Sequence, residues 1–233
     1  MPITPDHTIY WQWGFVHLDA TILYTWIVML LLTIVSWLVT RRLDTADLYR
    51  SRWQNALEVV VQTIRAQIRE MCPNHSDAFL LPFVGTIFLF IALCSLLEVF
   101  PGWRAPTGSL STTAALAICV GVAVHVFGVW QQGVVEYLRH YIRPTFLMLP
   151  FHLLNETSRT LALAVRLFGN IMSESMIVGV LLAIVPIVFP LVMQVFGLLT
   201  GLIQAYIFAI LATVYIAAAA AQSQLDHEGA KHE

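Results

Sequence analysis

Arg166 is the residue of this sequence whose type and position point most directly to chemistry. It is the one cation in LALAVRLFGNIMSESM (161–176), a stretch made mostly of apolar residues. An arginine at bilayer depth costs about 2.5 to 3.5 kcal/mol on insertion scales, so an intramembrane charge is first considered a functional group. Arginine also keeps its proton when it is desolvated, and it could therefore act as a fixed barrier to protons and cations.

Polar side chains share the helical face of Arg166. At 100° per residue, Arg159, Asn170 and Ser173 lie within about 60° of Arg166 and of one another. Glu156 and Glu174 flank this face, ten residues before and eight after Arg166, which is about 15 Å and 12 Å along the helix axis. A carboxylate toward each end, with a cation between them, is the arrangement that ion passage through two offset half-channels needs.

The anionic partner of Arg166 is not close in the sequence. None of the residues within one helical turn of Arg166 is acidic. Because a permanent charge in the bilayer needs a counter-ion, we expect a carboxylate on another helix or on another subunit. Two structural roles stay open, since Arg166 could pair with an internal acid such as Glu98 or could extend to a membrane interface.

Several other polar residues have competing interpretations. Glu174 could be solvated near the outer surface, and Glu98, at the end of an apolar run, fits an interfacial position as well as the ion path. For His125 and His152 we favour a hydrogen-bonded packing role over a place on the ion path. These residues are therefore secondary candidates.

The composition indicates what kind of protein positions these residues. Of the 233 residues, 58% are hydrophobic and 11% are charged, and the mean hydropathy is +0.76. Such a chain is expected to be an all-α integral membrane protein. We expect about five transmembrane helices at 20–39, 79–100, 112–132, 145–185 and 190–221, and an amphipathic surface helix at 52–72. Residues 1–19 would form an external segment, 20–222 the membrane domain and 223–233 a cytoplasmic tail.

The apolar region from 145 to 221 could form two long helices or three ordinary ones. Pro186 and Pro190 favour a break near their positions. Two helices of about 35 to 40 residues would be about 50 to 60 Å long, against a hydrocarbon core of about 30 Å, and would have to tilt strongly. In an antiparallel hairpin of this kind, Gln204 comes near the level of Arg166 and could form a hydrogen bond with it.

The charged residues predict the orientation and exclude some partners. Six arginines fall between the first and second apolar runs and no Lys or Arg precedes the first, so the positive-inside rule places the N-terminus outside. A net charge of −2, with the basic residues spread over loops, argues against a nucleic-acid partner. The three cysteines are isolated, and nothing indicates a metal site or a disulfide framework. We also expect no cleaved targeting peptide.

Four segments resemble one known family, in that family's order. They are APTGSLSTT (105–113), GVVEYLRHYIRP (133–144), LLNETSRTLALAVRLFGN (153–170) and LIQAYIFAILATVYI (202–216). The family is subunit a of the F-type ATP synthases, the stator channel beside the rotating c-ring. The resemblance covers about residues 15 to 222, and its last two segments are highly specific.

This resemblance implies an ion-translocating stator subunit that is not itself an enzyme and binds no cofactor. Arg166 would face the ion-binding carboxylate of each passing c-subunit, with Asn170 and Gln204 beside it, and the two long helices would lie against the c-ring. The partners would be the c-ring, the subunit b peripheral stalk, the other synthase subunits and the lipid bilayer. The subunit would lie in a bacterial inner membrane, with its C-terminus in the cytoplasm. Its ion could be a proton or Na⁺.

The sequence departs from the family pattern at several positions. Family members often carry an acid or a histidine nine residues after the arginine, where this chain has Ser175, with Glu174 one residue earlier. Some members carry a histidine seven residues before the glutamine, where this chain has Gly197. The outer half-channel would therefore combine Glu174 with different neighbours. Glu156 and His152 compete for the inner one.

A stand-alone secondary transporter or channel, with Arg166 as the binding site of an anionic substrate, is the alternative function. It predicts internal repeats, which the sequence lacks. A membrane haem protein would use His125 and His152 as axial ligands, but no further pattern supports it. The sequence contains no GxxxxGK[ST] motif, so ATP chemistry would belong to partner subunits.

Overall fold

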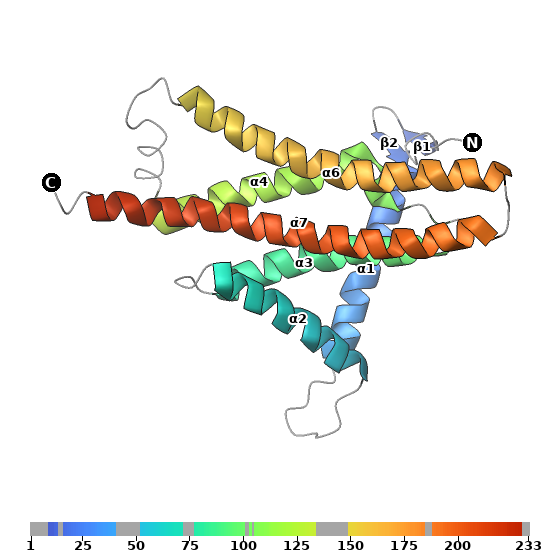
Figure 1. Cartoon of the computed structure of the whole chain (residues 1–233), viewed down its shortest axis with the longest axis horizontal. Coiled ribbons are helices and arrows are strands. Elements are labelled where there is room, and N and C mark those ends of the chain that lie inside the picture. Colours follow the sequence, from blue (N-terminus) through green and yellow to red (C-terminus); the bar gives the residue numbers. More distant parts are fainter. Residues whose placement is uncertain are drawn as a thin grey trace.

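The computed structural model describes residues 9–13, 16–40, 52–71, 77–100, 103, 105–133, 149–184 and 188–229. They form a bundle of helices with a small β-hairpin near the N-terminus (Figure 1). In chain order the elements are β1 (Ile9–Trp13), β2 (Val16–Asp19), α1 (Ala20–Thr40), α2 (Arg52–Met71), α3 (Asp77–Leu97), the 3₁₀ turn η2 (Pro106–Gly108), α4 (Leu110–Gln132), α6 (Leu149–Ile184) and α7 (Val188–Gly229).

Within these ranges, five helices are long and apolar enough to cross a membrane. They are α1, α3, α4, α6 and α7. A helix satisfies its backbone hydrogen bonds internally, which the bilayer requires of any spanning segment. The prediction of an all-α membrane fold with five such helices and one surface helix is confirmed. The antiparallel hairpin of β1 and β2, which pairs Trp13 with Val16, was not expected.

Helix α2 is the amphipathic sixth helix. Ile64 and Ile68 are buried one turn apart on the side that packs against α3, whereas Gln62, Arg65 and Arg69 are exposed. Figure 1 shows α2 running obliquely beneath α3, and α1 crossing the bundle at a steep angle. The alternation of apolar and polar residues at helical spacing explains why this helix lies on the outside of the bundle.

The last two helices form a long antiparallel hairpin (Figure 1). Helix α6 has 36 residues and α7 has 42, which corresponds to about 54 Å and 63 Å at 1.5 Å per residue. Pro190 lies in the first turn of α7, where its missing N–H removes no helical hydrogen bond. The C-terminal apolar region therefore consists of two long helices, not three ordinary ones.

The core lies where α3, α4, α6 and α7 pack together. Ile91 of α3, Leu167 of α6 and Phe208 of α7 are fully buried there. Small residues on α7 let the neighbouring helices approach closely; the buried ones are Ala205, Ala209 and Ala212. On α6, Leu163 and Leu167 face this core, whereas the outward face carries Arg166 among exposed apolar side chains such as Leu161 and Val165.

Candidate functional site

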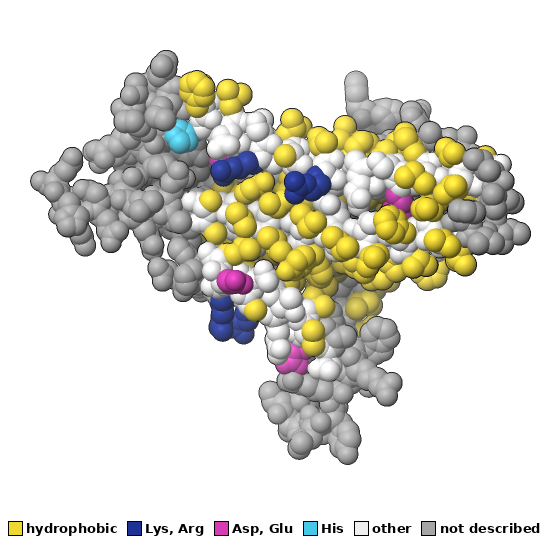
Figure 2. Space-filling model, in the orientation of Figure 1, with side chains coloured by type: hydrophobic (Ala, Val, Ile, Leu, Met, Phe, Trp, Pro, Cys, Tyr) yellow, Lys and Arg dark blue, Asp and Glu magenta, His cyan; other side chains and the backbone are white. Residues whose placement is uncertain are grey.

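Arg166 lies on the face of α6 that turns away from the core. Leu163 and Leu167 of the same helix are buried, whereas Arg166 and Ser173 are exposed. In Figure 2, dark-blue basic side chains lie among yellow and white atoms over the region of the α6–α7 hairpin. The fold thus places a charged group on an apolar surface.

Arg166 has no anionic partner in the part of the chain that the structure describes. No ion pair joins it to Glu98, Glu156 or Glu174. Because an unpaired charge is unfavourable in a bilayer, Arg166 needs an anion from outside these described residues.

Asn170 on α6 and Gln204 on α7 are amides whose donors are not used by the described residues. Gln204 is 7% exposed, and its Nε2 has no acceptor in the described ranges. The buried Nδ2 atom of Asn170 likewise has none there. An unpaired buried donor costs about 1 to 3 kcal/mol. No hydrogen bond joins Gln204 to Arg166 in these ranges, although the sequence had suggested one as a possibility, and the two amide nitrogens have no acceptor there.

Glu174 of α6 packs directly against Gly197 of α7. A Cβ atom built on Gly197 would overlap the carboxylate of Glu174. Gly197 is buried and Glu174 is half-buried. The absence of a side chain at Gly197 therefore leaves the space that the Glu174 carboxylate occupies.

Glu98 lies close to Glu174, just past the end of α3. It follows the apolar span Leu80–Leu97. Burial and, to a smaller extent, the charge of Glu174 raise the pKa of Glu98 from its ordinary value of 4.5 to about 7. A carboxyl group with such a pKa can take up and release protons near neutral pH. Helices α3 and α6 thus bring two acids together at one end of the bundle.

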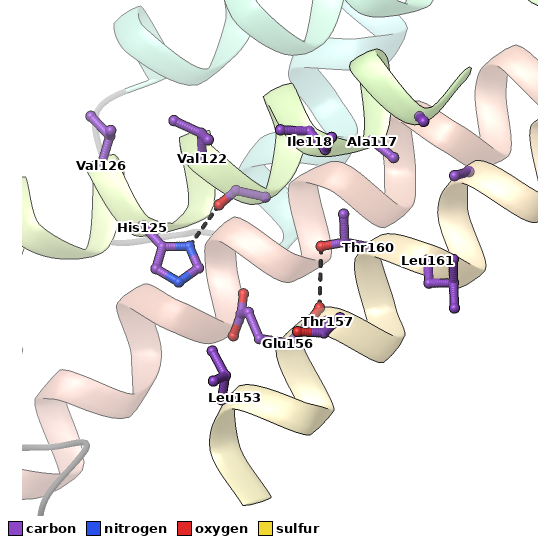
Figure 3. A pocket seen from close by; sticks show the side chains of 13 residues that line it. Ala117, Ile118, Val122, His125, Val126, Leu153, Glu156, Thr157, Thr160 and Leu161 are labelled. Atoms are coloured by element: carbon purple, nitrogen blue, oxygen red, sulfur yellow. Dashed lines mark hydrogen bonds between the residues drawn. The ribbon is translucent and has the colours of Figure 1, made fainter. Parts of the chain in front are cut away.

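Glu156 lies toward the other end of α6, in a cleft of about 550 Å³ between α4 and α6. Figure 3 shows the ring of His125 on α4 and the carboxylate of Glu156 facing the same space. The Nδ1 atom of His125 is 2.7 Å from the carbonyl oxygen of Gly121. His125 and Glu156 are far apart in the sequence, and the fold brings them to one cleft.

Two further candidates, Ser175 and His152, also lie on α6. Ser175 donates its hydroxyl hydrogen bond to the carbonyl oxygen of Ile171 at 3.0 Å. His152 is half-buried, one turn of α6 before Glu156. In the described ranges, no group of three or more His, Cys, Asp or Glu side chains could hold a metal ion.

Arg159 makes a contact that the sequence did not predict. Its guanidinium carbon lies 5.5 Å from the centre of the Tyr215 ring on α7, within the range of a cation–π interaction. An arginine on one helix and a tyrosine on the next give no signal of such a contact until the register of the hairpin is known. The contact ties α6 to α7 and distinguishes Arg159 from Arg166.

Comparison with known proteins identifies relatives over nearly the whole chain. The family model described as ATP synthase A chain matches residues 22–217. The chain is 58% identical to ATP synthase subunit a 1 of Crocosphaera subtropica, over 93% of this chain and 94% of the relative. It is 56% identical to ATP synthase subunit a 2 of Acaryochloris marina, over 98% of this chain and 97% of the relative. It is 58% identical to ATP synthase subunit a of Albidiferax ferrireducens, over 94% of each chain.

Proposed function

This chain belongs to the ATP synthase A chain family, subunit a of the F-type ATP synthases, and from that membership we propose that its ion path consists of two offset half-channels that meet at Arg166. The membership confirms the resemblance seen in the sequence. The protein is thus a non-catalytic, ion-translocating membrane subunit of the stator, and its partners are the other subunits of the synthase.

At the centre of the path, Arg166 acts on the ion-binding carboxylate of each c-subunit that passes it. The observation that carries this proposal is the exposure of Arg166 on the apolar face of α6 without an anion among the described residues. A guanidinium stays charged in the membrane, so it favours the ionised form of a nearby carboxylate and releases the cation from it. Its fixed charge also keeps ions from crossing directly between the half-channels.

Asn170 and Gln204 supply hydrogen-bond donors next to Arg166. Their buried amide nitrogens have no acceptor in the described ranges, which supports a role for them toward a group on another subunit. The carboxylate of a c-subunit is a suitable acceptor, because hydrogen bonds to a charged group are stronger than those between neutral groups. The α6–α7 hairpin would then lie against the c-ring.

The outer half-channel contains Glu174, with Ser173, Ser175 and Glu98 near it. The proximity of Glu98 to Glu174 supports this grouping, since the charge of one acts on the other. The inner half-channel contains Glu156, and His152 lies one turn away on the same helix. The distance along α6 between Glu156 and Glu174 is about 27 Å, so the two half-channels are offset along this helix.

The subunit lies in the inner membrane of a bacterium, with its N-terminus outside and its C-terminus in the cytoplasm. The arginines between the first and second apolar runs support this orientation through the positive-inside rule. The subunit b peripheral stalk would hold the subunit still while the c-ring turns. The translocated ion is a proton or Na⁺.

ATP-driven transport by the whole complex in inverted membrane vesicles tests this function. Arg166→Ala should abolish transport while the soluble sector still hydrolyses ATP. Arg159→Ala is the matched control, because it removes an arginine from the same helix whose guanidinium already has a partner in Tyr215. This control should keep most of the transport. The effects of a protonophore and of added Na⁺ on the wild type identify the ion.

Normal coupled transport by Arg166→Ala would contradict the proposed role of Arg166. The alternative of a stand-alone transporter, with Arg166 as the site of an anionic substrate, predicts instead that the isolated subunit transports an anion without ATP.

A further inference from the structure

Helices α3 and α7 meet through a serine on one helix and a glycine on the other. Ser95 lies near the end of α3 and is 5% exposed, and Gly201 on α7 is also buried. A Cβ atom built on Gly201 would lie 2.5 Å from the Oγ atom of Ser95 and 2.8 Å from its Cβ atom. The absence of a side chain at position 201 therefore lets α3 approach α7 this closely.

The Cβ atom of Ser95 limits this approach more firmly than its hydroxyl does. The hydroxyl could rotate away, whereas the Cβ atom is fixed to the backbone of α3. Without the side chain of Ser95, the atom nearest to a Cβ atom on Gly201 would be the Cα atom of residue 95, at 4.0 Å. That is an ordinary van der Waals distance. A Cβ atom thus fits at one of the two positions, 95 or 201, but not at both.

The hydroxyl of Ser95 has its partner within α3. It donates a hydrogen bond to the carbonyl oxygen of Ile91, one turn earlier, at 3.1 Å. A buried hydroxyl needs such a partner, and here its own helix supplies it. The contact of Ser95 with α7 is therefore a matter of shape.

The same contact sets the register between the two helices. Helices α3 and α7 run in opposite directions, so a step forward along α3 is a step backward along α7 (Figure 1). Glu98, three residues after Ser95, therefore comes to the level of residues 197–198. The carboxylate of Glu174 lies at this level, beside Gly197. The register thus explains why Glu98 and Glu174 are close.

Gln204 lies on the other side of the contact. It is three residues after Gly201 on α7, about 4.5 Å along the helix axis, and both residues are buried. A displacement of α7 at Gly201 therefore moves the amide of Gln204 as well. One contact between α3 and α7 affects groups on both sides of it.

We propose that Ser95 is a positioning residue of the ion path, which acts by packing α3 into the space that Gly201 leaves on α7. On one side the contact holds Glu98 near Glu174, and on the other it holds Gln204 in place. The inference rests on the proposed function for the roles of these three groups. Ser95 itself takes no part in passing the ion.

The test exchanges the side chains at the two positions. Gly201→Ala forces the two Cβ atoms about 0.6 Å apart, from 2.8 Å to an ordinary contact of 3.4 Å. A misplacement of about 1 Å can cost a hundredfold in rate, so ATP-driven transport by the whole complex in inverted vesicles should fall about tenfold. Gly201→Ala combined with Ser95→Gly should regain most of the transport. Gly201→Ala combined with Ser95→Ala should not, because the Cβ atom of residue 95 stays.

Two single variants are the controls. Gly85→Ala makes the same change on α3 at a position where a Cβ atom would meet nothing within 4 Å, and it should transport as wild type does. Ser95→Ala removes the hydroxyl but keeps the Cβ atom, and it should keep most of the transport. Immunoblots of the membranes give the amount of subunit, so that transport is compared per subunit.

The protonation of Glu98 provides a second readout, which does not depend on transport. Burial and the charge of Glu174 raise the pKa of Glu98 to about 7, and the infrared band of its protonated carboxyl group follows this pKa through a pH series. In Gly201→Ala the pKa should fall below about 7, because α3 and α7 move apart. Combination with Ser95→Gly should restore it. If the Gly201→Ala subunit does not accumulate, Ser95→Thr replaces it in both measurements, since it adds one methyl group to the same contact.

The pattern of rescue decides the outcome. Equal transport per subunit by Gly201→Ala and Gly85→Ala would overturn the proposal, as would normal transport by Ser95→Thr where that variant is used. Rescue by Ser95→Ala as complete as by Ser95→Gly would also overturn it. A large loss in Ser95→Ala alone would overturn it too, and would place the hydroxyl on the ion path. None of these results would affect the function proposed for Arg166, which fails only if Arg166→Ala transports normally.

Discussion

The carboxylate of Glu174 on α6 occupies the space beside Gly197 on α7 that any side chain at position 197 would fill. The two positions are far apart in the sequence and meet because α6 and α7 are antiparallel. One position thus supplies an acid, and the other supplies the room for it. This relationship leads to a direct test of the outer half of the ion path.

Gly197→Ala should displace the Glu174 carboxylate and lower ATP-driven transport about tenfold or more. A glycine-to-alanine change inside a helix by itself favours the helix by about 1 kcal/mol, but overpacking costs about 1 to 3 kcal/mol. Gly179→Ala on α6 is the control, because a Cβ atom there would meet nothing within 4 Å. Equal transport by the two variants would show that the contact has no functional role.

The pKa of Glu98 should depend on Glu174. In Glu174→Gln this pKa should fall below about 7 but stay above its ordinary value of 4.5, because burial, the larger cause, is retained and the nearby charge is lost. The infrared band of the protonated carboxyl C=O group, followed through a pH series, measures the pKa of Glu98. The band is assigned to Glu98 by its absence in Glu98→Gln. An unchanged midpoint would mean that the two acids do not interact.

Glu98 should also make the stability of the complex depend on pH. The pKa of its carboxyl is raised to about 7 in the folded protein, so between 4.5 and 7 the folded state binds more protons than the unfolded chain. Its contribution to stability is therefore complete below pH 4.5 and is lost as the pH rises through 7. Thermal denaturation of the detergent-solubilised complex should show a smaller decline over this range in Glu98→Gln than in wild type.

Gln204→Leu should impair transport without lowering the amount of subunit in the membrane. The Nε2 atom of Gln204 is buried without an acceptor in the described ranges, so its replacement by an apolar side chain of similar size removes an unpaired polar group. Immunoblots of membranes give the amount of subunit, and transport in vesicles gives the activity. Loss of the protein itself would assign Gln204 to the fold and not to the ion path.

The contact between Arg159 and Tyr215 should contribute to the packing of α6 on α7. A double-mutant cycle with Arg159→Gln and Tyr215→Leu, measured by thermal denaturation of the complex, should give a coupling of about 0.5 to 1 kcal/mol. The same cycle with Arg166→Gln in place of Arg159→Gln should give no coupling. A coupling of Tyr215 to Arg166 would mean that the two arginines share the ring.

The fold was largely predictable because span length and apolar composition decide it. The apolar runs that form α1, α3, α4, α6 and α7 can be recognised from the sequence alone. In α2, apolar residues recur at helical spacing, and this spacing identifies its buried isoleucines. The N-terminal hairpin was missed, since its two strands are four and five residues long and carry little periodicity.

The site was predictable along α6 but not between helices. The helical period aligns Arg166 with Asn170 from the sequence alone. By contrast, the contact of Glu174 with Gly197 and the shared cleft of His125 and Glu156 depend on the register between helices. That register follows from three-dimensional packing, which residue spacing along one helix does not encode.

The exposure of Arg166 also affects the life of the subunit before it reaches the synthase. In the arrangement proposed above, the exposed guanidinium of a newly inserted chain would face lipid, at a cost of about 2.5 to 3.5 kcal/mol. A neighbour that brings an anion removes this cost and, by mass action, stabilises the folded form to which it binds. The arginine thus links quality control to assembly, because an orphan subunit is the least stable form and the easiest one for membrane proteases to remove.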